Sequence, residues 1–193
     1  MSCTIATGKA RYCKVQPGGI DKVYVIDRFD DAAAKTLTLD GTTNILTAST
    51  GLVSYDGNPG AYFQFDTDPY LSALNQTIIV NEGGGVGFQQ DIELVFKGVY
   101  AKADKTFQNL SNGTWQMVVE DNTGTLYFCG LQKGLVCTGG SFGHNGDKAL
   151  TDNQAYTLTF SCIELEPAAN CATAALFEAQ GDVTISAAQL DGA

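Results

Sequence analysis

The feature that most limits how this chain can fold is a regular alternation of apolar and polar side chains between Trp115 and Leu165. Two runs, Trp115 to Glu120 and Thr125 to Leu131, follow the two-residue period of a pleated strand. Between them, Asp121-Asn122-Thr123-Gly124 supplies the short polar side chains and the glycine that a tight hairpin turn requires. A third run, Tyr156 to Cys162, has the cleanest alternation in the chain. This stretch therefore predicts a β-hairpin followed by a further strand.

Similar patterns predict secondary structure in the rest of the chain. Further strands are expected at residues 21–29, 35–39, 45–48, 75–80, 90–100 and, more loosely, 182–186. Within 90–100 the inward side chains are Ile92, Leu94 and Phe96, and the outward ones are Asp91, Glu93, Val95 and Lys97. A second hairpin is expected between Leu52 and Phe65, around a run of turn formers at residues 56–60. Residues 101–110 are the best helix candidate, with Phe107 and Leu110 on one face and a stop at Ser111-Asn112-Gly113.

Together these elements predict a mainly β fold, a β-barrel or a β-sandwich, with one short flanking α-helix. The length of 193 residues and the apolar content of 44% fit a single domain with one sizeable core. Residues 1–19 are expected to form an N-terminal lead. Residues 167–193 are expected to form an alanine-rich C-terminal arm, which would become ordered against a neighbouring subunit.

The charge balance and the cysteines limit the classes of function. A net charge of −10 argues against a surface that grips nucleic acid phosphates, although it suits a surface past which DNA must slide. The six cysteines lack the spacing of a zinc or thioredoxin-like motif, and the N-terminus lacks a secretory apolar region, so we expect reduced structural thiols. Because no apolar run approaches the length of a membrane span, we expect a soluble protein made in a cytosol.

No pattern in the sequence indicates a catalytic, metal or cofactor site. His144, the only histidine, falls in a predicted glycine-rich loop, Ser141 to Gln154, with Asp147 and Asp152 nearby. A site there would need a second ligand or a base held at fixed geometry, which proximity in a loop does not supply. The run Glu82-Gly83-Gly84-Gly85 lacks the Gly-Lys-Ser/Thr of a phosphate-binding loop and is followed by a strand. We therefore expect no enzyme activity, no metal and no cofactor.

The order of these motifs resembles the C-terminal half of bacteriophage tail tube proteins. The resemblance is carried by VVEDNTGTLYFCGLQKGLV, by the glycine-rich loop after it and by AYTLTFSCIELEPA, together with the lead CKVQPGGIDKVYVIDRFDD. The chain keeps Asp121-Asn122, Gly124, Gly130, Gly134, Tyr156 to Phe160, Glu164 and Glu166 of the family pattern. It departs from that pattern at Ala155, where a glycine is usual, and by the insertion of Thr123.

The resemblance implies a β domain with a long protruding hairpin loop, six copies of which close into a ring. Stacked rings would form the hollow tail tube of a virion, assembled in the host cytoplasm together with other tail and neck proteins, and the genome would pass through it without specific binding. Asp91 and Glu93 would face the lumen, where negative charge keeps DNA from adhering. The expected contacts between subunits are Leu52, Val53, Tyr55, Tyr62, Phe63 and Phe65.

Three alternatives stay open at this point. The aromatic residues at 62–65 would equally well fill the core of their own subunit. The chain would also suit another virion component, such as a head decoration, neck or tail-terminator protein. A carbohydrate-binding β-sandwich is the third alternative, although Trp115 and scattered tyrosines make a thin stacking platform for a sugar.

Overall fold

The computed structural model describes residues 18–27, 36–40, 45–50, 63–68, 70–97, 101–143, 155–171 and 186–187. Within these ranges the chain is mainly β with one α-helix, which confirms the predicted fold class. The strands are β1 Ile20–Asp27, β2 Thr36–Leu39, β3 Ile45–Thr50, β4 Phe63–Asp66, β5 Ala73–Val80, β6 Val86–Lys97, β7 Thr114–Asp121, β8 Leu126–Cys129, β9 Leu135–Phe142, β10 Ala155–Glu164, β11 Ala169–Cys171 and β12 Ser186–Ala187. The helix α1 is Ala101–Asn112.

The strands form one sheet in the order β2-β3-β11-β8-β7-β9-β10-β6-β5, with β1 pairing beside β7 and β4 beside β1. All of these pairings are antiparallel except that of β11 with β3. The order begins at β2 and ends at β5, and no pairing joins these two strands within the described residues. Of the two predicted architectures, the closed barrel is therefore wrong for a single copy of the chain.

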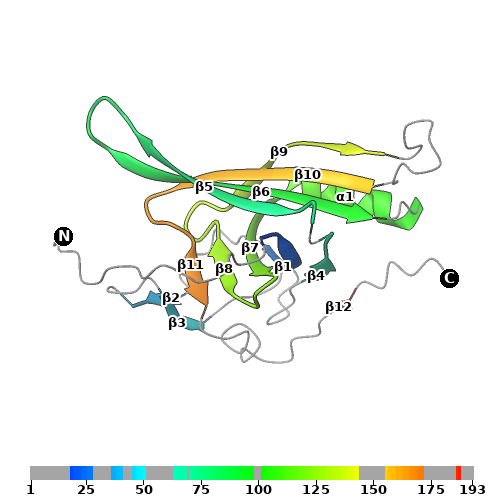
Figure 1. Ribbon diagram of the computed structural model, residues 1–193, viewed down its shortest axis with the longest axis horizontal. Helices are drawn as coiled ribbons and strands as arrows, with labels where there is room; N and C mark the ends of the chain where they lie inside the picture. Colours follow the sequence, from blue (N-terminus) through cyan, green and yellow to red (C-terminus); the bar gives the residue numbers. More distant parts are fainter. Residues whose placement is uncertain are drawn as a thin grey trace.

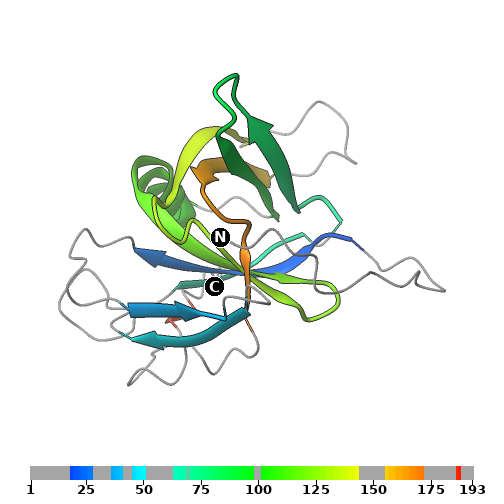
Figure 2. The same cartoon turned by 90° about the vertical axis from the view of Figure 1, so that its left-hand side faces the viewer.

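The sheet bends on itself into two layers. Figure 1 shows β5, β6, β9 and β10 lying above β1, β7, β8 and β11, and Figure 2 shows the same separation from the side. The largest apolar cluster lies between the layers, with Ile92, Leu94, Leu158 and Phe160 among its members. A smaller cluster lies on the far side of the lower layer: Tyr24, Ile26, Val118, Leu126, Phe128, Ala169 and Cys171. Burial of both faces of β7 and β8 explains why these strands are so apolar.

The predicted hairpin at Trp115 to Leu131 is confirmed as β7 and β8. Its turn is held by the Asp121 carboxylate, whose Oδ1 accepts hydrogen bonds from the backbone N–H groups of Thr123 at 2.8 Å and Thr125 at 2.9 Å. Gly124 has a φ of 79°, a left-handed conformation that favours glycine. Local turn chemistry thus sets the register of this pair.

The predicted helix is also confirmed, and aromatic packing attaches it to the sheet. Phe107 and Leu110 are buried, as their spacing indicates. The Phe107 ring stacks on that of Tyr156 at 4.3 Å and lies 4.9 Å from that of Phe96. At the end of α1, Trp115 Nε1 donates a hydrogen bond to the carbonyl of Leu110 at 2.6 Å, which satisfies one of the carbonyls a helix end leaves without a partner.

Three details of the sequence interpretation are corrected. Val95 lies on the outward face of β6, as expected, but is buried because the β4–β5 connection crosses it. Its backbone N–H donates to Ser72 Oγ, and its carbonyl accepts a hydrogen bond from Asp68 N–H. The expected loop after Gly139-Gly140 begins later, since β9 continues to Phe142. The first residues expected in the C-terminal arm, Ala169–Cys171, are a strand of the same chain's sheet.

Candidate functional site

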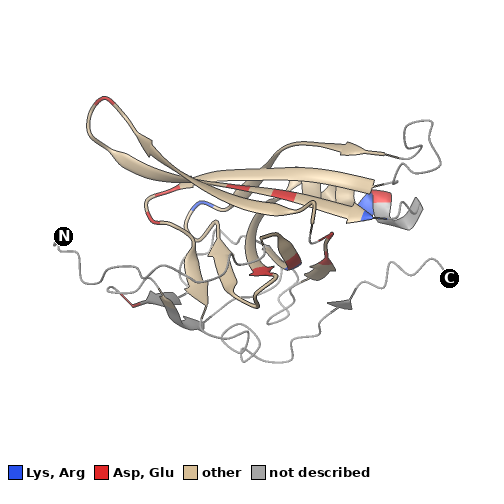
Figure 3. Cartoon of the chain, viewed as in Figure 1, with Lys and Arg blue, Asp and Glu red and all other residues tan. Residues whose placement is uncertain are grey.

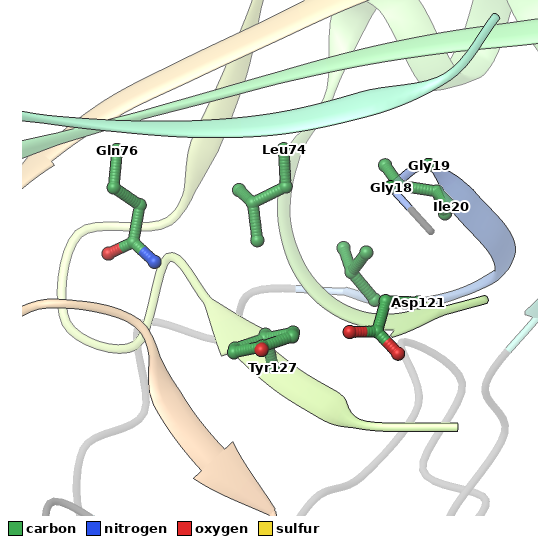
Figure 4. Close-up of a pocket in the computed structure, with 8 residues that line it drawn as sticks. Gly18, Gly19, Ile20, Leu74, Gln76, Asp121 and Tyr127 are labelled. Carbon is green, nitrogen blue, oxygen red and sulfur yellow. The ribbon is translucent and has the colours of Figure 1, made fainter. Parts of the chain in front are cut away.

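A pocket of about 290 Å³ lies between the start of β1, strand β5 and the β7–β8 hairpin. In Figure 4, Leu74 and Gln76 point from β5 toward Tyr127, with Asp121 at the other side of the pocket. The Asp121 carboxylate is engaged in its own turn, and Gln76 Oε1 accepts a hydrogen bond from the backbone of Ala168 at 2.9 Å. Burial, and secondarily Asp121, raises the pKa of Tyr127. The volume lies at the lower limit of ligand pockets, and its polar groups have structural roles.

The buried thiols are also poorly suited to chemistry. Of the six cysteines expected to be structural thiols, Cys3 and Cys13 lie outside the described residues. The other four, Cys129, Cys137, Cys162 and Cys171, are free, and all but Cys137 are buried. Burial raises the pKa of Cys162 and of Cys171 to about 12, and that of Cys129 well above its usual range. Because the thiolate is the reactive form, these groups are weak nucleophiles and weak metal ligands. No group of three or more His, Cys, Asp or Glu side chains within the described ranges is arranged to hold a metal ion.

The more informative feature is the outward face of strands β9, β10, β6 and β5, which we term the polar sheet face. The strand register places one short polar row across it at Asn75, Asp91 and Ser161, and another at Glu93 and Thr159. Thr77, Gln89, Thr157 and Ser141 lie on the same face. The opposite face of these strands is the apolar core.

The predicted lumen residues, Asp91 and Glu93, both lie on the polar sheet face. Asp91 is half-buried, and its Oδ1 accepts hydrogen bonds from Ser161 Oγ at 2.5 Å and from Gln89 Nε2 at 3.0 Å. Glu93 is exposed. The lysine closest to this face in the register, Lys97 at the end of β6, pairs with Asp68. Within the described ranges the face carries carboxylates, amides and hydroxyls. It also carries two exposed apolar side chains, since the register places Val136 opposite Ser161 and Ile163 opposite Gln89. Figure 3 shows acidic positions along β6.

The four strands behind the polar sheet face have two edges without a strand partner in the part of the chain that the structure describes. One is β5, which pairs only with β6, and the other is the segment 137–141 of β9, which pairs only with β10. Asn81 N–H donates to the carbonyl of Gly85 across the hairpin turn. In an antiparallel ladder every second residue of a strand bonds to the same neighbour, so the odd-numbered residues of β5 bond to β6. The N–H groups of Leu74, Gln76 and Ile78 therefore point away from β6, to the side where β5 has no described partner. Just after β9, Gly143 N–H donates to the carbonyl of Ala155 in β10, so Ser141 also faces β10. The N–H of Gly140, between these positions in the alternation, points away from β10.

A third feature is the far part of the β5–β6 hairpin, residues 76–90, which we term the ribbon. Strand β10 runs alongside it as far as Phe88, and the part beyond, residues 79–87, projects past the other described strands in both views (Figures 1 and 2). Its turn is Asn81 to Gly85, with Gly84 at a φ of 80°, so the glycine-rich run is a hairpin tip. The ribbon was missed as a projecting element because the sequence shows only that 75–80 is rich in β-forming residues.

The expected subunit contacts are only partly visible. Leu52, Val53, Tyr55 and Tyr62 lie outside the described residues, as do His144, Asp147 and Asp152. Phe63 is 43% exposed on β4, whereas Phe65 is 8% exposed and packs against Phe96 and Phe107. Phe65 thus fills its own core, and Phe63 is accessible.

Comparison of the chain with protein-family models, with curated proteins and with solved structures finds no match. Among the described residues, no helix has the length and apolar character needed to cross a membrane. The surfaces described above are therefore the features of the molecule that bear on its function.

Proposed function

We propose that this chain is the subunit of a phage tail tube, a structural protein whose copies close into rings that stack around a channel for the genome. The observation that carries the proposal is a four-stranded sheet with a polar outer face and an open edge on each side. The motif resemblance between residues 118 and 168 supports the same conclusion. The partners would be other copies of the chain, tail and neck proteins, and passing DNA.

The direction of the strands favours closure of the sheet between copies. In the order β9-β10-β6-β5 each strand is antiparallel to the next. Because there are four strands, the two outer ones, β9 and β5, run in opposite directions. When copies are related by rotation about one axis, β5 of one copy therefore meets β9 of the next in the antiparallel sense. The open N–H groups of both strands would be satisfied, and a ring would remove edges that otherwise invite uncontrolled association.

Such a ring would place the polar sheet face on the inside, since the opposite face is covered by the lower layer of each copy. The lumen would then present Asp91, Glu93 and a set of hydroxyl and amide groups to DNA, with Val136 and Ile163 as the exposed apolar side chains among them. Repulsion between carboxylates and phosphates would reduce adhesion, as a conduit requires.

The test combines light scattering, negative-stain microscopy and amide hydrogen exchange. We expect a large, concentration-dependent oligomer seen as rings of constant diameter that stack. We also expect slowed exchange in peptides covering residues 73–78 and 137–141 on assembly, because inter-subunit hydrogen bonds would protect amides that have no strand partner in the single copy. A strict monomer at every concentration would count against the proposal. Rings that never stack would favour a neck or decoration protein.

A further inference from the structure

The ribbon keeps the two-sided pattern of the sheet beyond the body of the molecule. Its polar side continues the polar sheet face with Thr77 and Gln89, while its other side continues the face that elsewhere is the core. On that side Ile78 is 63% exposed, Val80 65% and Val86 50%. Clustered exposed aliphatic side chains of this kind mark contact surfaces.

A complementary apolar cavity lies beside helix α1 and strands β1 and β4. It has a volume of about 280 Å³, and its apolar walls are Val25, Phe63, Phe65, Leu110 and Trp115. At about 30 Å³ of liquid per water molecule, it has room for roughly nine waters. It is therefore wide enough to admit aliphatic side chains in place of water.

The ribbon and the cavity lie toward opposite ends of the molecule. Strand β5 begins close to β4 and runs away from it, so Val80 lies about 23 Å along the strand from Ala73 at a rise of about 3.3 Å per residue. Figure 1 shows the ribbon and β4 toward opposite ends of the long axis. The ribbon therefore does not reach the cavity of its own chain, but a neighbouring copy displaced along that axis would bring the two together.

The charges at the two ends are also complementary. Glu82 is exposed at the ribbon tip. Lys105 is exposed on α1 one turn before Asn109, which lines the cavity, and its Nζ donates a hydrogen bond to Gln108 Oε1 at 3.1 Å. Figure 3 shows the acidic ribbon tip toward one end of the long axis and, toward the other, a basic position on α1 next to an acidic one. Opposite charges on two approaching surfaces favour encounter in one orientation.

We infer that the ribbon of one copy docks its apolar side, including Val80 and Val86, into the cavity beside β4 of a second copy, with Glu82 next to Lys105. This contact joins two different surfaces, so it repeats without closing and forms an open-ended stack. The inference rests on the proposed function, because it names the contact that would join one ring to the next. It also explains the exposure of Phe63, which would be covered in the stack.

The test compares Val80→Asp with Thr77→Asp, which adds the same charge to the same strand on its polar side. Val80→Asp should raise the concentration needed for stacking by at least about tenfold, since it places a charge in an apolar contact, and should leave single rings intact. Thr77→Asp should stack like the wild type. Negative-stain microscopy and sedimentation measure both results.

Zero-length carbodiimide cross-linking of mixed ¹⁵N-labelled and unlabelled protein identifies the partner surface. We expect a cross-link between Glu82 of one copy and Lys105 of another. The inference is overturned if Val80→Asp stacks at the wild-type concentration, or if Glu82 cross-links only to lysines elsewhere. Rings without the Glu82–Lys105 cross-link would leave the proposed function standing and refute the ribbon contact. A Glu82–Lys105 cross-link between copies that form no rings would support the ribbon contact and refute the proposed function.

Discussion

Asp68 shows how one side chain ties two elements together. Its carboxylate pairs with Lys97 of β6 and accepts the N–H of Tyr70 at 3.1 Å, and its backbone N–H bonds to the carbonyl of Val95 at 2.9 Å. The hydrogen bond from Lys97 is the main cause that lowers the pKa of Asp68, followed by the N–H of Tyr70. The ionised form therefore holds the β4–β5 connection against the end of β6.

This pKa shift predicts an acid-dependent contribution to stability. In the unfolded chain the Asp68 carboxylate binds a proton near pH 4, and in the folded chain it does so only at lower pH. Its contribution to the free energy of unfolding is therefore fully present above about pH 4 and is lost as the pH falls through the folded pKa. In Asp68→Asn the contribution is absent. Urea unfolding of both proteins between pH 3 and pH 7 should show a stability difference that is largest at neutral pH and shrinks in acid. Parallel pH profiles would contradict this role for Asp68.

At the scale of elements, the pairing of β9 with β10 depends on how closely the two backbones approach. A Cβ atom built on Gly140 would lie 2.3 Å from the carbonyl oxygen of Thr157, whereas one built on the adjacent Gly139 meets nothing within 4 Å. Since the contact at Gly140 is with backbone, a side chain there would push β9 away from β10. The sequence shows two equivalent glycines, and only the pairing distinguishes them.

The two glycines offer a matched pair of substitutions. We expect Gly140→Ala to lower the free energy of unfolding by about 1–3 kcal/mol, the usual cost of forcing extra atoms into a packed site. Gly139→Ala should change it by less than about 0.5 kcal/mol. Denaturant titration of the two variants measures the difference. Equal stability would show that β9 does not approach β10 as closely as described.

At the level of the whole molecule, the net charge of −10 includes carboxylates on the face that we propose lines the channel. Glu93 is exposed there, and ring symmetry would repeat it around the lumen. Adhesion of DNA to such a surface depends on phosphate contacts with cations and weakens steeply with salt. The charge of this one face should therefore control whether the assembled tube retains DNA.

Glu93→Lys tests this dependence, with Glu166→Lys as a control that makes the same charge change at an exposed position outside the polar sheet face. We expect assembled Glu93→Lys to retain short duplex DNA at low salt and release it as salt rises, and we expect the wild type and Glu166→Lys not to retain it. Co-sedimentation of DNA with the assemblies measures retention. Equal retention by the two variants would argue against an inward-facing Glu93.

Elements whose signals are local could be predicted from the sequence alone. The β7–β8 hairpin, strand β10 and helix α1 follow from side-chain period and turn chemistry within a few residues, and the same alternation placed Asp91 and Glu93 on one side of β6. Packing in three dimensions sets which strands are neighbours, and it leaves β5 and β9 each with one edge that no described strand covers. It also covers Val95 and makes the β5–β6 hairpin project with aliphatic side chains exposed. These features depend on pairing and packing between residues far apart in the chain, and local periodicity carries no information about which distant strand will lie alongside.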